Sequence, residues 1–185
     1  EEFNTFLECV DNPLYRAYFD ALYWTGMRRG EAIALQCSDI SDGWINIHAS
    51  QRDAVNGLKP TKTKAARKIQ IDDALNDELM ALKKAYKTGY LFGGESALSP
   101  TQISRVFNDA IRKSGVKKIR LHDLRHSHAT WLINHGVNIV AVSKRLGHSS
   151  IEQTLKTYTH LLESTDNEMM KIINSEKNGS TMVPR

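Results

Sequence analysis

Long hydrophobic runs are missing from this chain of 185 residues. No apolar stretch approaches the ~18 residues that a transmembrane helix needs, so the sequence predicts no membrane-spanning segment. The first ten residues, EEFNTFLECV, are acidic and lack the basic start of a secretory signal peptide. An initiator methionine is also missing, and we therefore expect the chain to be part of a longer protein.

Cysteine is scarce, and repeats and low-complexity tracts are absent. The two cysteines, Cys9 and Cys37, show no CxxC spacing, which argues against common zinc and redox motifs. We expect both to be reduced, small core residues of a cytoplasmic protein. With 41% hydrophobic and 25% charged residues, the composition is typical of one globular domain with a sizeable core.

The charge is only modestly basic, with a net charge of +4 and a pI of about 9.0. Lysine and arginine gather in residues 59–68 and 112–125, whereas the first 42 residues hold eight acidic side chains. A basic face opposed to an acidic one suits a polyanion such as DNA. An ordinary solvated surface stays the alternative.

Apolar periodicity and capping residues predict helices over most of the chain. The expected helices cover residues 13–27, 29–40, 72–87, 99–115, 122–136, 138–148, 150–162 and 163–175. Strand signals occur at residues 44–50, 57–62 and 67–71. The pattern predicts an α+β fold that is mainly helical, with a helical core and a small antiparallel three-stranded sheet at one edge.

Helices 122–136 and 138–148, joined by a glycine turn, are also compatible with a DNA-reading helix-turn-helix. We expect Val140, Val142 and Leu146 to make core contacts instead.

Four separated segments hold residue types that suit a phosphate group. They are TGMRRGE (25–31), TKTKAARK (61–68), LHDLRHSHATWL (121–132) and LGHSSIEQTLKTYTH (146–160). The candidate residues within them are Arg28, Lys62, His122, Arg125, His148 and Tyr158. Cationic and imidazole groups bind an anion with delocalised charge, and a tyrosine beside them could attack its phosphorus. Taken one at a time, these features fit a surface turn, solvated lysines, a capping histidine and a packed tyrosine better than a catalytic site.

Two neighbours of these residues allow alternatives. Glu31, three residues after Arg28, could hold that arginine or cap the next helix. His122 and His126 have the i, i+4 spacing of a zinc site, but the segment lacks the glutamate of HExxH, and neither cysteine is close in sequence. We therefore expect no metal site, and we expect core or capping roles for His126 and His128.

All four segments, in this order, resemble the tyrosine recombinase family of phage and transposon integrases. In this resemblance TGMRRGE supplies a catalytic arginine, Arg28, and KTK at 62–64 supplies a general acid, Lys62. HDLRHSHAT supplies His122 and Arg125, LGH supplies His148, and LKTYTH supplies Tyr158. The chain departs from the family at Gln70, where proline is frequent, and at His128, where an apolar residue is common.

The resemblance implies a catalytic domain over residues 1–175, without the family's N-terminal DNA-binding domain, and a flexible tail over residues 176–185. It implies that Tyr158 attacks a phosphodiester and forms a 3′-phosphotyrosine link, while Lys62 protonates the leaving 5′-oxygen. Arg28 and Arg125 would hold the phosphoryl oxygens, His148 would donate a further hydrogen bond, and His122 would assist proton transfer with Tyr158.

No cofactor and no metal is implied. The implied partners are double-stranded DNA attachment sites and three further copies of the protein, in a homo-tetramer on DNA at the bacterial nucleoid. Further DNA contacts are expected from the hairpin side chains Lys59, Lys64, Arg67 and Lys68.

Two other functions stay open. A type IB topoisomerase uses similar chemistry, and a non-catalytic DNA-binding module would use only the positive charge. The linked HxxR and LGH segments, with Tyr158 ten residues after His148, favour the recombinase.

Overall fold

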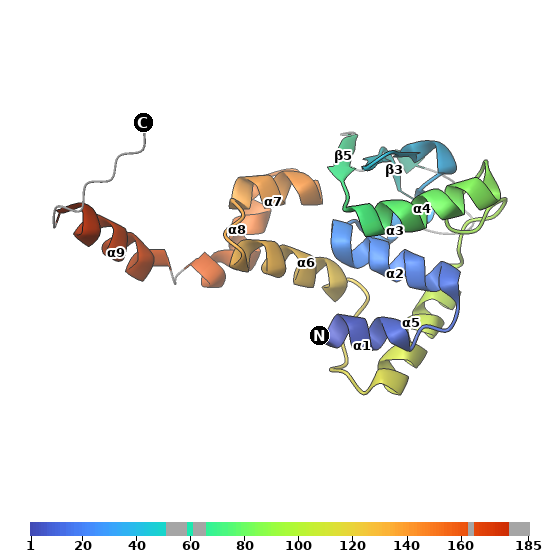
Figure 1. The fold of residues 1–185 in the computed structure, drawn as a ribbon, viewed down its shortest axis with the longest axis horizontal. Coiled ribbons are helices and arrows are strands. Elements are labelled where there is room, and N and C mark those ends of the chain that lie inside the picture. The colour runs from blue at the N-terminus through green and yellow to red at the C-terminus, as the bar shows by residue number, and fades with distance from the viewer. Residues whose placement is uncertain (51–58, 61–65, 163–164, 178–185) are drawn as a thin grey trace.

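The computed structural model describes residues 1–50, 59–60, 66–162 and 165–177. Within these residues the fold is mainly helical, as the sequence predicts (Figure 1). The helices are α1 (Glu2–Glu8), α2 (Pro13–Thr25), α3 (Arg29–Ala34), the 3₁₀ turn η1 (Cys37–Asp39), α4 (Asp73–Tyr86), α5 (Pro100–Ser114), α6 (Asp123–Asn134), α7 (Ile139–Leu146), α8 (Ile151–Leu162) and α9 (Thr165–Lys177).

The strands form a small antiparallel sheet at one edge of the molecule, above α4 in Figure 1. Its order is β1 (Ile40–Ser41), β2 (Trp44–Ile47), β5 (Arg67–Gln70). A separate pair joins β3 (Ala49–Ser50) to β4 (Lys59–Pro60).

The predicted sheet therefore differs in one member. The segment expected at 57–62 contributes β4, which pairs with β3, and β1 is the third strand of the main sheet instead. The tight turn at Gly43, with φ of +72°, places Ile40 opposite Ile45, and both side chains are buried. A two-residue strand is too short to show the alternation by which strands are recognised in a sequence.

Helix α2 lies at the centre of the core and packs against α1, α3, α4 and α6. Its aromatic residues Tyr18 and Phe19 are fully buried, and they meet Phe92 and Phe107 edge to face. Full burial of one such large side chain contributes roughly 1.5–3 kcal/mol, so this cluster holds the helices in fixed positions around α2.

Both ends of α2 follow from the sequence. The Asn12 side chain accepts a hydrogen bond from the Leu14 amide at 2.9 Å, and Pro13 occupies the first turn. The helix ends at Gly26, which has φ of +66°. A Cβ atom there would lie 2.6 Å from the His128 ring, so the turn that leads to Arg28 requires glycine.

Three local features of the structure differ from what the sequence predicts. Helix α1 was not predicted, and its Phe6 and Leu7 are buried against the core. The helix expected over 29–40 ends at Ala34. The backbone becomes extended at Leu35, and the Leu35 carbonyl accepts a hydrogen bond from the Leu91 amide. Val142 and Leu146 are buried as predicted, but Val140 is 42% exposed.

Helix α9 stands apart from the other helices in Figure 1. It exposes four large apolar side chains, Met169, Met170, Ile172 and Ile173. None of the helices in the described part of the chain has both the length and the apolar character needed to cross a membrane.

Candidate active site

Five of the six candidate residues meet around one cavity of about 230 Å³. Arg28 comes from the turn between α2 and α3, His122 and Arg125 from the start of α6, His148 from the end of α7, and Tyr158 from α8. The sixth candidate, Lys62, lies outside the described residues.

Arg125 is the buried centre of the site, with 4% of its surface exposed. Its guanidinium donates to the carbonyl of Gly26 at 2.7 Å and to the carbonyl of Leu146 at 2.8 Å. Burial, and next the charge of Arg28, lower the pKa of Arg125 to about 9, so the group is cationic at neutral pH. A guanidinium has five N–H groups, and these two bonds leave donors for a phosphate.

Arg28 is more open, with a side chain that is 40% exposed. Its guanidinium donates to Glu31 Oε1 at 2.9 Å and to the carbonyl of Gly147 at 3.2 Å. The other carboxylate oxygen of Glu31 accepts from the Arg28 amide at 2.8 Å. Glu31 therefore fills both roles considered from the sequence, because it holds the arginine and caps α3.

Tyr158 faces the cavity from α8 and is 4% exposed. Burial raises the pKa of its hydroxyl above the ordinary value, and the charge of Arg125 opposes that rise. The phenol is therefore protonated at neutral pH, and a base must accept its proton before the oxygen can act as a nucleophile.

His126 contacts that hydroxyl, with its Nδ1 atom 2.9 Å from the Tyr158 oxygen. The expected core or capping role for His126 is therefore wrong. The signal for this contact in the sequence is the i, i+4 spacing from His122, which places both rings on one side of α6. The rings of His122 and His126 lie edge to face, with centroids 4.9 Å apart.

His148 follows Gly147 at the end of α7, and its Nδ1 atom lies 2.6 Å from the hydroxyl of buried Thr154. Burial and the charge of Arg125 lower the pKa of His148 to about 4. The ring is neutral at physiological pH, so it can donate a hydrogen bond without carrying charge.

His128 belongs to the core, as the sequence predicts, and is 2% exposed. Its Nε2 atom accepts from Arg145 Nε at 3.1 Å, whereas its buried Nδ1 has no hydrogen-bond partner within the described residues. Burial lowers the pKa of His128 to about 3, and the charge of Arg145 adds to this effect. The imidazole is thus neutral.

Of the four hairpin cations expected to contact DNA, Lys64 and the Lys59 side chain lie outside the described residues, and Lys68 is exposed on β5. Arg67 is turned inward. Its side chain is 12% exposed and forms an ion pair with Glu31 at 2.7 Å. A DNA contact by Arg67 does not fit this geometry, because its donors are used inside the protein.

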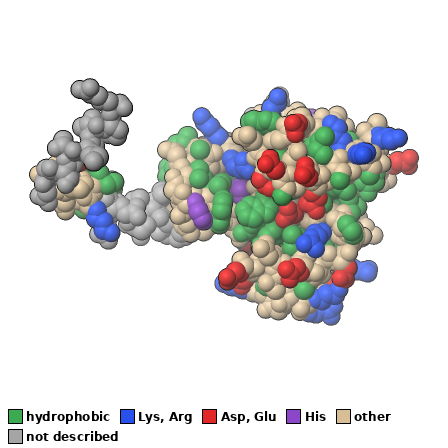
Figure 2. All heavy atoms as spheres, viewed as in Figure 1, with side chains coloured by type: hydrophobic (Ala, Val, Ile, Leu, Met, Phe, Trp, Pro, Cys, Tyr) green, Lys and Arg blue, Asp and Glu red, His purple; other side chains and the backbone are tan. Residues whose placement is uncertain are grey.

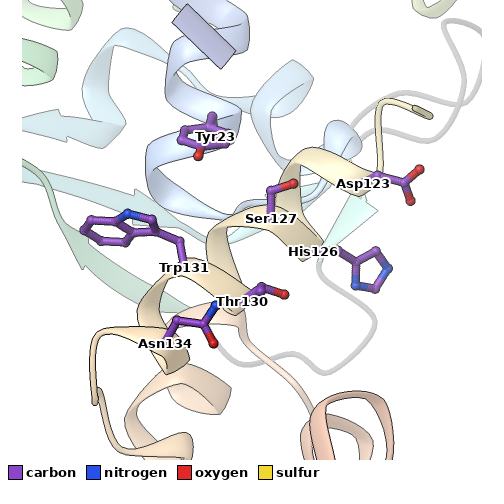
Figure 3. A pocket seen from close by; sticks show the side chains of 7 residues that line it. All are labelled: Tyr23, Asp123, His126, Ser127, Thr130, Trp131 and Asn134. Carbon is purple, nitrogen blue, oxygen red and sulfur yellow. The ribbon is translucent and has the colours of Figure 1, made fainter. Parts of the chain in front are cut away.

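Another hollow, of about 500 Å³ and more open to solvent, lies along α6 beside Tyr23 of α2. Figure 3 shows Tyr23 facing α6, and it shows His126 and Trp131 extending to opposite sides of that helix. The hollow shares His126 with the candidate active site but contains neither Tyr158 nor an arginine, so it lacks the chemistry of a phosphate site.

Across the described ranges, no group of three His, Cys, Asp or Glu side chains is arranged to hold a metal ion. The candidate site is instead a cationic cavity with a tyrosine hydroxyl and an imidazole in contact. Such a cavity can bind a phosphodiester, stabilise added negative charge and present a nucleophile to the phosphorus.

Comparisons with known proteins identify the family of this chain. The model of the phage integrase family matches residues 1–165. The ICEBs1 integrase of Bacillus subtilis strain 168 is 31% identical, over 91% of this chain and 51% of that protein. Tyrosine recombinase XerC of Pediococcus pentosaceus is 33% identical, over 78% of this chain and 49% of that protein.

Solved structures of recombinases share the fold. The Tn1549 transposon integrase in complex with circular intermediate DNA superposes with a TM-score of 0.78 at 21% identity, covering 91% of this chain and 64% of that one. The XerA recombinase gives a TM-score of 0.70 at 24% identity, covering 98% and 62%. The chain spans about half the length of the two sequence relatives, and with the family match over residues 1–165 it belongs to the phage integrase family, the tyrosine recombinases.

Proposed function

We propose that the intact protein carries out site-specific DNA recombination for a phage or another mobile element. The observation that carries this proposal is the Tyr158 hydroxyl, which contacts His126 in a cavity that also holds Arg28 and Arg125. The names of the relatives, an integrase and a tyrosine recombinase, support the same reaction. Because the substrate is DNA, we place the enzyme at the bacterial nucleoid.

The proposed cleavage step uses the side chains that line this cavity, together with Lys62. The Tyr158 oxygen attacks the phosphorus and forms a P–O bond, while its proton passes to His126. Arg28 and Arg125 hold the non-bridging oxygens, on which charge increases in the pentacoordinate transition state. The bond from phosphorus to the 5′-oxygen then breaks, Lys62 protonates that oxygen, and the 3′-phosphate remains on Tyr158.

The two other histidines have supporting roles in this proposal. With the Thr154 hydroxyl donating to Nδ1 of His148, the ring proton lies on Nε2 and can be donated to a phosphoryl oxygen. His122, beside His126, can relay the proton onward. The 5′-hydroxyl of a second strand reverses the step, so the ester itself conserves the bond energy and no nucleotide cofactor is needed.

The electrostatics of one face limit where DNA can bind. Acidic side chains gather over α2 and α4 on the face shown in Figure 2. Burial, and next the charges of Glu78 and Asp72, raise the pKa of Asp20 on α2 to about 6. Clustered carboxylates repel the phosphate backbone, and we infer that the DNA approaches a different face.

The test of this function is a suicide substrate, a duplex with a nick that lets the cleaved end diffuse away. Incubated with the intact protein, it should give a covalent protein–DNA adduct on a denaturing gel, and EDTA should not change the yield, because the proposed chemistry uses no metal. A non-catalytic module predicts no adduct. Loss of the adduct in EDTA, with recovery on adding a divalent ion, would contradict the mechanism.

A second assay, with two synthetic duplexes that carry the attachment sites, distinguishes a recombinase from a type IB topoisomerase. A recombinase exchanges their strands, whereas a topoisomerase-like enzyme relaxes a supercoiled plasmid without exchange.

We further propose that the protein acts as a homo-tetramer on DNA, with α9 docking on a neighbouring copy. The support is the exposure of Met169, Met170, Ile172 and Ile173 on a helix that stands apart from the body. Flexible, apolar methionine contacts suit a surface that must form and separate during strand exchange. Such docking would link the position of Tyr158 in one copy to the contact made by the next.

Removing residues 163–185 should weaken cooperative assembly on paired sites and leave the fold intact. A finer pair of variants is Ile172→Asp, which places a charge on the apolar surface, and Lys171→Asp, the adjacent control on the exposed polar surface. Band shifts on single and paired sites measure assembly. Normal assembly by Ile172→Asp, or unfolding of the truncated protein, would be evidence against docking on a neighbour.

A further inference from the structure

Arg67 is the first residue of strand β5, and its guanidinium donates hydrogen bonds to groups inside the protein. Its Nη1 and Nη2 atoms donate to the two carboxylate oxygens of Glu31 at 3.0 and 2.7 Å, and its Nε donates to the carbonyl of Arg145 at 2.9 Å. This is the bidentate arrangement in which a guanidinium binds a carboxylate most strongly. It joins β5 to α3 and α7.

Glu31 serves two arginines at once. Its Oε1 atom accepts from Arg28 Nη1 at 2.9 Å and from Arg67 Nη1 at 3.0 Å. Glu31 is 1% exposed, and burial alone would raise the pKa of its carboxyl group. The hydrogen bonds and charge of Arg67, followed by those of Arg28, hold that pKa below its ordinary value, so the carboxylate is ionised.

The two arginines differ in what they can reach. The Arg67 side chain is 12% exposed, whereas the Arg28 side chain is 40% exposed and lines the cavity with Tyr158. Arg67 does not line that cavity. One carboxylate between two guanidinium groups leaves one positive charge in excess, and the more exposed Arg28 is the group placed to offer it to a ligand.

Gly147 makes the position of Arg67 possible. This glycine has φ of +68°, and a Cβ atom there would lie 2.6 Å from Arg67 Nη1. Its carbonyl accepts from Arg28 Nη2 at 3.2 Å. The backbone just before His148 is therefore in close contact with the Arg67 guanidinium and is also bonded to Arg28.

Building on the proposed function, we propose that Arg67 is a positioning residue, which neutralises Glu31 so that the charge of Arg28 remains available for the scissile phosphate. Without Arg67, the only side-chain donor to this buried carboxylate among the described residues would be Arg28. A buried unpaired charge is costly, so Glu31 would draw the Arg28 guanidinium toward itself and offset its charge. Cleavage would slow even though every group that touches the DNA is still present.

The experiment compares four variants of the intact protein, Arg67→Gln, Arg67→Lys, Glu31→Gln/Arg67→Gln and Arg16→Gln. The last changes an exposed arginine of α2 and is the matched control. Two quantities are measured for each, the single-turnover cleavage rate of the suicide substrate at saturating DNA and the Kd for the same DNA. Circular dichroism checks the fold.

We expect Arg67→Gln to slow cleavage at saturating DNA by about 10-fold or more, with Kd within about twofold of wild type. Arg67→Lys keeps the charge without the fork and should slow cleavage less. Adding Glu31→Gln to Arg67→Gln should restore part of the rate, because the competing carboxylate is gone.

Three results would overturn the proposal. The first is a double variant as slow as Arg67→Gln or slower, which would mean that Arg67 only maintains the local structure. The second is a weaker Kd with an unchanged rate, which would make Arg67 a DNA contact. The third is an unchanged rate in Arg67→Gln.

If Arg67→Gln does not fold, Arg67→Lys replaces it, with Glu31→Gln/Arg67→Lys as its partner. The same partial restoration is then expected. Absence of an adduct with the wild-type protein would count against the proposed function itself, not against the role of Arg67.

Discussion

Tyr158→Phe is expected to abolish the covalent adduct with a suicide substrate. The substitution removes the hydroxyl that contacts His126 and keeps the ring that is buried against α6 and α7. Because no oxygen remains to form the phosphate ester, the loss should be complete rather than partial. A denaturing gel of the intact protein with labelled DNA measures it, and band shifts show that the DNA is still bound.

His126→Gln is the informative companion. It leaves the Tyr158 oxygen in place and removes the imidazole that accepts its proton, so it should slow adduct formation by roughly 10²-fold without abolishing it. Adduct in wild-type amount from Tyr158→Phe would remove Tyr158 as the nucleophile. A wild-type rate from His126→Gln would leave the tyrosine in place but assign its proton to another acceptor.

Arg28→Lys and Arg125→Lys should each slow cleavage by on the order of 10²-fold, which corresponds to roughly 3 kcal/mol of transition-state stabilisation. Lysine keeps the charge but loses the planar fork. In Arg125 that fork also bridges the carbonyls of Gly26 and Leu146, so the replacement disturbs the cavity wall as well as the phosphate contact. The single-turnover rate at saturating DNA is the quantity to measure.

Arg29→Lys is the matched control, because Arg29 is exposed and does not line the cavity with Tyr158. Its rate should stay within about twofold of wild type. A comparably small effect in Arg28→Lys or Arg125→Lys would show that the fork at that position is not needed for cleavage.

The helices were largely predictable because their caps and periodicity are local. Asn12 with Pro13 and the left-handed glycines Gly26, Gly115 and Gly147 mark helix ends that can be read directly from the sequence. Helix α1 could not be predicted, because a helix of seven residues with two buried side chains shows too little apolar periodicity. Strand β1, the third strand of the main sheet, could not be predicted for a similar reason. Ile40 is paired with β2 across a tight turn, and β1 is too short to show an alternation of apolar and polar residues.

Only the site residues that belong to the family's sequence motifs could be predicted. Arg28, His122, Arg125, His148 and Tyr158 line one cavity, as the resemblance implies. The roles of His126 and Arg67 could not be predicted, because their partners Tyr158 and Glu31 lie 32 and 36 residues away in the sequence. Spacing along one helix shows which side chains share a face, but it cannot show which other helix packs against that face.

The most direct test of the central claim is to locate the covalent bond. The adduct formed on a suicide substrate by the intact wild-type protein is digested with protease and nuclease, and the nucleotide-bearing peptide is sequenced by mass spectrometry. The account predicts a single modified peptide, with the nucleotide attached through its 3′-phosphate to Tyr158. Attachment to any other residue, or through a 5′-phosphate, would contradict it.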